Sequence, residues 1–245
     1  MKKSVICGLL WLAFSAVGFS TSLTIQSNDL WVDDGGGGFL AYLNGNTSNP
    51  LEVYCADYRN YVDPPQTYDV NIDTPNLLAP DDGLGDTRYG TTTTFTWNSL
   101  VGTTISMSGS EFGNAYDRYV MAGWLTTNYD PLNPGGGQDE GIQSAIWTLL
   151  DVDGTSHTEG DVATWLQNAV NFMSNTAQFN SFAADVRVYS QTDISGDNNL
   201  DLSSSGNRYA TGAQEMIGVA PEPADLALVG CGLLWIGLLR KRIRA

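Results

Sequence analysis

The chain has 245 residues, with 27 Asp and Glu against 11 Lys and Arg, which gives a formal net charge of −16 at pH 7. A surface this acidic repels nucleic acid and anionic lipid, so neither is an expected partner. The single histidine and three cysteines form no cluster with the spacing of a zinc site, so no metal or cofactor is expected.

The N-terminal segment, residues 1–20, predicts a secretory signal peptide. Two lysines precede an apolar run over 5–19, and the small residues Gly18 and Ser20 suit a cleavage site. An N-terminal membrane anchor is the alternative, but the run is shorter than the roughly 20 apolar residues that a spanning helix needs. We therefore expect the protein to be exported.

The first half of the exported chain predicts short strands separated by turns. β-Branched and aromatic residues favour strands, whereas Gly, Asp, Asn and Pro favour turns. Alternation places Leu51, Val53 and Cys55 on one face of a strand and Tyr54 on the other. The expected strands lie at 23–26, 38–43, 51–58, 68–72, 91–97 and 103–107, and the rest of 63–91 predicts loop.

Three helical patterns follow. Apolar residues recur at helical spacing, and Asp139 and Glu140 suit the first turn of the second helix because they complement its dipole. A possible capping box at 156–159 precedes the third helix. The expected helices lie at 116–124, 139–150 and 162–173, and two final strands are expected at 184–189 and 215–219.

These elements predict an α+β fold. A β-rich N-terminal half would form a sheet or partial barrel, with three helices packed on it, in a single extracellular domain over residues 21–219. Alternating oxygen-bearing residues at 193–201, and more weakly at 81–86, resemble a calcium loop. Asn198 and Ser204 stand where such a loop carries glycine and glutamate, so polar turns are the favoured interpretation.

The C-terminal segment, residues 220–245, combines a Pro-Glu-Pro motif at 221–223, an apolar run over 226–239 and a basic cluster ending at Arg244. Together they resemble the PEP-CTERM sorting signal. The resemblance implies a Gram-negative bacterium, an exosortase-type processing protease, and display at the cell surface or in a biofilm matrix. A simple membrane anchor is the alternative, and this tail is the only expected membrane contact.

Between the two terminal signals the chain keeps one cysteine, Cys55, and no lysine; its five basic residues there are all arginine. Exported proteins usually pair their cysteines in disulfides, so an unpaired thiol suggests a chemical role. The absence of lysine would spare the protein from reacting with its own amines. Compositional drift toward acidic residues is the alternative explanation.

Two short segments carry a family resemblance. Val53-Tyr54-Cys55-Ala56-Asp57 and Ile142-Gln143-Ser144-Ala145-Ile146-Trp147 resemble the thioester domains of bacterial surface adhesins, over about residues 38–152. In that family such segments supply the two halves of an internal thioester. The resemblance implies that Cys55 and Gln143 form this bond, and that an amine-bearing ligand is captured once, without enzymatic turnover.

Such a bond requires a thiol held against an amide, donors for the oxyanion, and exclusion of water. Gln143 is expected near a helix N-terminus, which supplies backbone donors. Tyr54 and Trp147 are expected to shield the bond, although these residues and Trp124 are also typical core aromatics.

Two alternatives remain. A cysteine hydrolase or transglutaminase needs a histidine beside Cys55, and His157 is the only histidine in the sequence. A structural or binding protein of the matrix would instead keep a free Cys55, as a small buried hydrophobe, and an intact Gln143 amide.

Overall fold

The computed structural model describes residues 21–31, 37–58, 62, 64–90, 114–130, 137–150, 160–192 and 214–220, with only the backbone described over 27–31. Several sequence predictions lie outside these residues. They are the signal peptide, the expected strands at 91–97 and 103–107, the capping box at 156–159 with His157, the oxygen-rich loop at 193–201 and the sorting tail.

The described strands close into a barrel in the order β1-β2-β3-β6-β5-β4. All neighbouring strands are antiparallel, including β1 and β4, whose pairing completes the circle. The strands are β1 (Thr21–Trp31), β2 (Gly37–Leu43), β3 (Leu51–Cys55), β4 (Gln66–Asp73), β5 (Val186–Gln191) and β6 (Met216–Val219).

The predicted α+β class is confirmed, but the barrel is not confined to the N-terminal half of the chain. β3 does not continue the sheet to β4, its successor in sequence; β6 and β5 lie between them. Two strands from the C-terminal half therefore close the barrel. This insertion places Met216 directly opposite Cys55.

Four helices are described rather than the three predicted: α1 (Ala115–Thr126), α2 (Gly137–Leu150), α3 (Val162–Ser174) and α4 (Thr176–Ala183). A short 3₁₀ turn, η1, spans Pro80–Gly83. The missed helix α4 begins immediately after Asn175, which ends α3 and whose side chain accepts from the Gln178 N–H. One asparagine thus serves as the end of one helix and the cap of the next. None of the described helices is long and apolar enough to cross a membrane.

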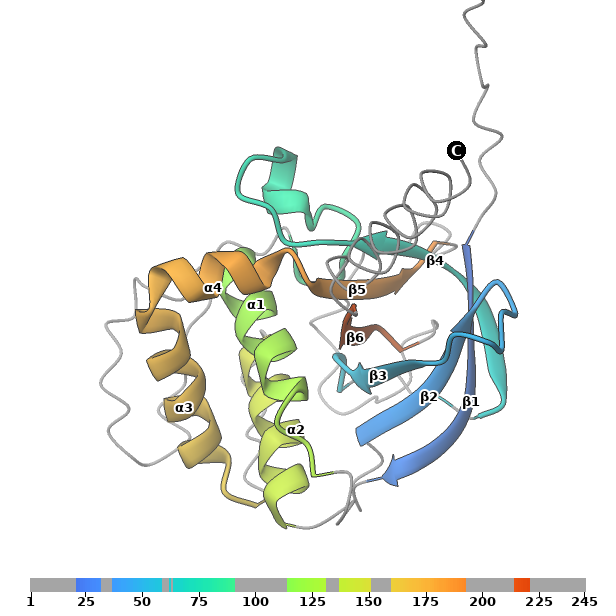
Figure 1. The fold of residues 1–245 in the computed structure, drawn as a ribbon, viewed down its shortest axis with the longest axis horizontal. Helices are drawn as coiled ribbons and strands as arrows, with labels where there is room; N and C mark the ends of the chain where they lie inside the picture. Colours follow the sequence, from blue (N-terminus) through green and yellow to red (C-terminus); the bar gives the residue numbers. More distant parts are fainter. Residues whose placement is uncertain are drawn as a thin grey trace, which may run out of the picture.

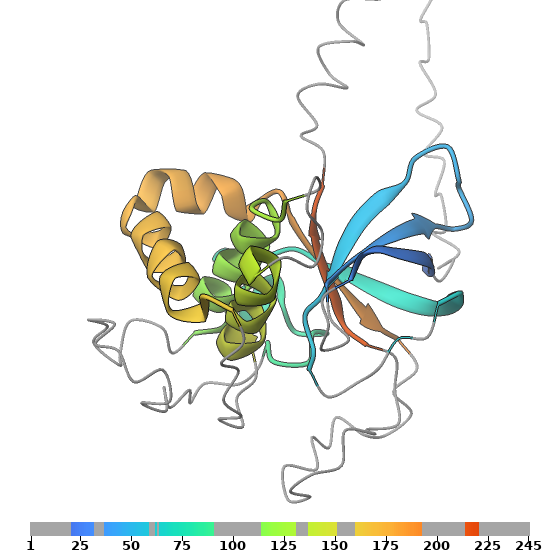
Figure 2. The same ribbon diagram turned by 90° about the horizontal axis from the view of Figure 1, so that it is seen from below.

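The helices form a layer on one side of the barrel (Figures 1 and 2). α1 packs against α2 and α3 and also contacts β5 and β6. This close approach requires Gly123, because a Cβ atom at that position would lie 2.6 Å from a methyl group of Val186 in β5. The absence of a side chain therefore sets the distance between the helix layer and the sheet.

Two hydrophobic cores result, one between helices and barrel and one inside the barrel. β3 contributes to both, since its side chains alternate between the two faces. Tyr54 belongs to the helix-side core, whereas Val53 and Cys55 belong to the barrel core. The predicted alternation of this strand is confirmed, and it directs the sulfur away from the helix-side core and into the barrel.

Candidate functional site

Cys55 is the last residue of β3, and its side chain is completely buried and not in a disulfide. Strand pairing fixes its backbone against β6. Burial raises the pKa of the Cys55 thiol, and the nearby Asp57 carboxylate raises it further. Hydrogen bonds from the Gln214 side chain and from the Gly37 N–H act in the opposite direction. The thiol is therefore neutral at neutral pH.

Gln143 lies in the second turn of α2, and its side chain is also completely buried. Its Nε2 atom donates a hydrogen bond of 2.8 Å to the backbone carbonyl of Cys55, 88 residues away in the sequence. The fold thus brings together the two residues that the sequence motifs single out. The carboxamide is held directly against the strand that carries the thiol.

The carbonyl oxygen of Gln143 accepts two hydrogen bonds. The Gly37 N–H donates from β2 and the Tyr129 hydroxyl donates from the segment after α1, each at 2.8 Å. With the bond to Cys55, the carboxamide is fixed by contacts from three separate parts of the chain. A buried amide with its oxygen doubly bonded is polarised at its carbonyl carbon.

Gly37 links the carboxamide to the thiol. Its N–H faces the Gln143 oxygen and also contributes to the electrostatic environment of the Cys55 sulfur. The φ angle of Gly37 is 114°, a conformation that L-residues rarely adopt. Glycine is therefore required where β2 presents this donor. The sequence predicted a turn up to Gly37 and a strand from Gly38, and the structure begins β2 one residue earlier, at Gly37.

Aromatic side chains cover the pair on both faces of β3. Tyr54 packs against Tyr129 with ring centroids 4.4 Å apart. Trp147 lies in the barrel core with Cys55, and its ring contacts the Tyr58 ring edge-on at 4.9 Å. Tyr54 and Trp147 are both buried, as expected for shielding residues. Trp124 stacks on Phe172 within the helix layer and does not belong to the barrel core.

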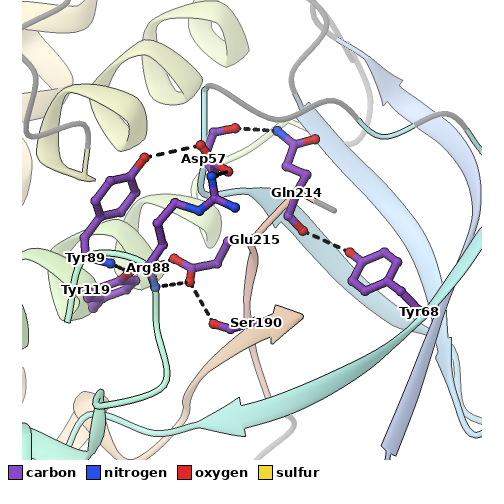
Figure 3. Close-up of polar contacts among 8 residues, drawn as sticks. All are labelled: Asp57, Tyr68, Arg88, Tyr89, Tyr119, Ser190, Gln214 and Glu215. Atoms are coloured by element: carbon purple, nitrogen blue, oxygen red, sulfur yellow. Dashed lines mark hydrogen bonds and ion pairs between the residues drawn. The ribbon is translucent and has the colours of Figure 1, made fainter. Parts of the chain in front are cut away.

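A second carboxamide also neighbours the thiol. Gln214, just before β6, is buried, and its Nε2 atom donates to the Asp57 carbonyl at 2.7 Å (Figure 3). Within the described part of the chain, its Oε1 atom is buried without a hydrogen-bond partner. Its backbone carbonyl accepts from the Tyr68 hydroxyl at 3.0 Å. No sequence motif marked this residue.

A buried polar network adjoins these residues (Figure 3). Its centre is Glu215, which accepts short hydrogen bonds from the Tyr119 hydroxyl, the Ser190 hydroxyl and the Arg88 N–H. Burial raises the pKa of Glu215, and these donors oppose that rise. Only the start of a strand near Glu215 was expected from the sequence, so this network was also missed.

The described residues contain no group of three or more His, Cys, Asp or Glu side chains that could hold a metal ion. Asp81 and Asp82, part of the weaker calcium candidate, lie in η1 with φ angles of 50° and 53°. Such angles are typical of Asp in tight turns. The structure gives the calcium hypothesis no support at 81–86.

No protein-family model, curated protein or solved structure matches this chain significantly.

Proposed function

We propose that Cys55 and Gln143 form an internal thioester and that the protein uses this bond to attach itself covalently to an amine-bearing surface ligand. One observation carries the proposal. The nitrogen of the buried Gln143 carboxamide donates a hydrogen bond to the backbone carbonyl of Cys55, and its oxygen accepts hydrogen bonds from two donors. An amide resists attack by a thiol, so it must be both held in place and polarised, and this arrangement supports both.

The bond-forming step replaces the amide nitrogen of Gln143 by the sulfur of Cys55. The Cys55 sulfur attacks the Cδ atom of Gln143, the Cδ–Nε2 bond breaks, and the nitrogen departs as ammonia with the proton of the thiol. Because burial keeps this thiol neutral, its proton is available to the leaving nitrogen as the new bond forms. No external oxidant, metal or base is consumed.

In the capture step an amine is the nucleophile and the Cys55 sulfur is the leaving group. An incoming amine attacks the thioester carbon, the C–S bond breaks, and the sulfur regains a proton. The product is an N-substituted amide on Gln143 and a free Cys55 thiol. Since no step restores the thioester, each molecule reacts once and the protein is not an enzyme.

The negative charge of the protein supports a positively charged ligand as its target. Each arginine in the described part of the chain is already engaged: Arg88 pairs with Asp57, and Arg118 and Arg187 donate to backbone carbonyls. With a net charge of −16, the protein would attract lysine-rich proteins or amine-bearing polymers. The terminal signals place this activity, in our proposal, at the cell surface or in the extracellular matrix after exosortase-type processing.

Intact-mass measurement of the exported protein tests the proposal. We expect a mass one ammonia below the sequence value, restored to the full value by Cys55→Ala or Gln143→Ala. Gln214→Ala, which removes the other carboxamide beside the thiol, is the matched control and is expected to keep the lower mass. Methylamine is expected to add to Gln143 and expose one thiol.

A full sequence mass with one titratable thiol in the folded protein would contradict the proposal. The protein would then be a non-covalent structural or binding component of the matrix, with Cys55 and Gln143 as buried core residues.

A further inference from the structure

We infer that Tyr129, together with the Gly37 N–H, forms an oxyanion site for the Gln143 carbonyl and that Tyr129 is a catalytic residue in both making and consuming the bond. This inference rests on the proposed thioester function. It assigns a chemical role to a residue outside both sequence motifs.

The geometry supplies two converging donors. The Tyr129 hydroxyl and the Gly37 N–H each lie 2.8 Å from the Oε1 atom of Gln143. When the sulfur attacks Cδ, the π electrons of the carbonyl move onto this oxygen, and negative charge develops between the two donors. Preorganised donors in a buried site stabilise such charge without having to reorient during the reaction.

Tyr129 is suited to donate a hydrogen bond and not to lose its proton. Burial raises the pKa of its hydroxyl well above the ordinary value, and the neighbouring Cys55, Tyr54 and Asp139 raise it further. The hydroxyl is therefore neutral throughout the physiological range. The oxyanion is stabilised by donation alone, and the proton that leaves with ammonia comes from the thiol.

Two contacts fix Tyr129 relative to Gln143. Its ring packs on Tyr54, the residue before Cys55, with a centroid separation of 4.4 Å. The next backbone N–H, that of Asp130, donates at 3.0 Å to the carboxylate of Asp139, one helical turn before Gln143 in α2. The hydroxyl is thus tied to both β3 and α2, the elements that carry the two reacting groups.

Gln214 provides an internal comparison. It is the same residue type, and its side chain interacts with the Cys55 thiol, whereas the Gln143 side chain donates to the Cys55 backbone carbonyl. The Oε1 atom of Gln214 has no hydrogen-bond donor within the described part of the chain. Its carbonyl is therefore not polarised, and charge developing on its oxygen would be unsupported. The two donors explain why the sulfur would be acylated by Gln143 and not by Gln214.

The same site serves both directions of the chemistry. In formation, the tetrahedral intermediate collapses by breaking Cδ–Nε2 and releasing ammonia. In capture, an amine adds to the thioester carbon, the oxyanion occupies the same two donors, and collapse breaks the C–S bond with return of a proton to the sulfur.

The test compares Tyr129→Phe with Tyr116→Phe in the full exported chain. Both variants keep the aromatic ring, and Tyr116 gives up a 3.2 Å hydrogen bond to Asn180 within the helix layer. The extent of thioester formation is measured by intact mass, and the rate of capture by thiol release after adding methylamine. We expect Tyr116→Phe to match the wild type and Tyr129→Phe to react on the order of 10²–10³-fold more slowly, or to fail to form the bond.

A Tyr129→Phe protein that forms the thioester fully and reacts with methylamine at the wild-type rate would overturn the inference while leaving the thioester function intact. A wild-type protein of full mass would instead overturn the proposed function. If Tyr129→Phe fails to fold, a fluorinated tyrosine introduced at position 129 replaces it. This stronger donor is expected to accelerate methylamine capture, and an unchanged or lower rate would contradict the oxyanion role.

Discussion

The Arg88 guanidinium lies 2.8 Å from the Asp57 carboxylate, two residues after Cys55. The Asp57 side chain is completely buried and also accepts from the Tyr89 hydroxyl at 3.2 Å. The backbone N–H of Arg88 binds Glu215 on the other side. The Arg88 segment therefore fastens the end of β3 to the start of β6, the two places from which Cys55 and Gln214 approach one another.

Replacing Arg88 by methionine would remove its guanidinium from the buried Asp57 carboxylate. Such a change is expected to lower the free energy of unfolding by about 3–5 kcal/mol, since removing one partner of a buried ion pair costs more than the pair itself contributes. Urea unfolding measures the loss. Arg187→Met is the control, because this arginine donates only to backbone carbonyls near the surface, and an equal loss there would contradict the role assigned to the ion pair.

Gly37→Ala tests the backbone donor. The φ angle of 114° disfavours a side chain, so alanine is expected to turn the N–H away from Gln143 and to reduce the fraction of molecules that lose ammonia. Gly45→Ala is the control, because Gly45 also has a positive φ angle, 68°, and no atom lies near the added methyl group. Intact mass compares the two variants. Equal thioester fractions in both would show that the donor is dispensable.

Gly123→Ala tests the spacing of the helix layer. The added methyl group would clash with Val186, so the variant is expected to lose about 1–3 kcal/mol of stability through overpacking. Adding Val186→Ala should make room for the methyl group. Thermal unfolding of both single variants and the double variant gives the coupling energy, and purely additive losses would be inconsistent with this contact.

Lowering the pH is expected to raise the free energy of unfolding, because the Asp73 carboxyl is more readily protonated in the folded state. Burial, followed by repulsion from Asp86 and Glu215, raises the pKa of Asp73 to about 7. Because the folded-state pKa lies above the unfolded one, this contribution is complete below about pH 4 and is lost as the pH rises through about 7. The melting temperature should therefore fall between about pH 4 and about pH 7.

Asp73→Asn should reduce this fall, since the amide keeps the shape of the side chain and removes its titration. Asp69→Asn changes the same formal charge at an exposed position on the same strand and serves as the control. The melting temperatures of the wild type and of both variants are measured by thermal scans across this pH range. Identical pH slopes for the two variants would exclude Asp73 as a source of the dependence.

The elements that sequence patterns predicted well are those defined by local periodicity. The apolar stripe of α2 and the alternation of β3 predict which residues share a face. The α2 stripe lies in the helix-side core, and successive β3 residues alternate between the two cores, as predicted. α4 was missed because it buries only Phe179 and Ala183, which is too few apolar positions to form a helical stripe between the predicted helix at 162–173 and the predicted strand at 184–189. The insertion of β6 between β3 and β5 involves pairing across most of the chain, which no local pattern encodes.

The residues of the candidate site likewise fall into two groups, those that a local sequence motif marks and those that only the tertiary structure places there. Cys55 and Gln143 stand in recognisable motifs, and the structure brings them into contact. Tyr129 follows a helix end and Gly37 belongs to a glycine run, so neither residue differs locally from an ordinary turn residue. Their importance comes from converging on one oxygen atom, a property of the tertiary structure alone.

β3 has only five residues and meets β6 through just two residue pairs, Tyr54 with Ile217 and Cys55 with Met216. Sliding this strand by a single position would interchange the sulfur and the phenol, because neighbouring side chains leave the sheet on opposite sides. A molecule with this shifted register could be compact and yet unable to form the proposed thioester. The register of β3 against β2 and β6 would therefore set the fraction of molecules that can react.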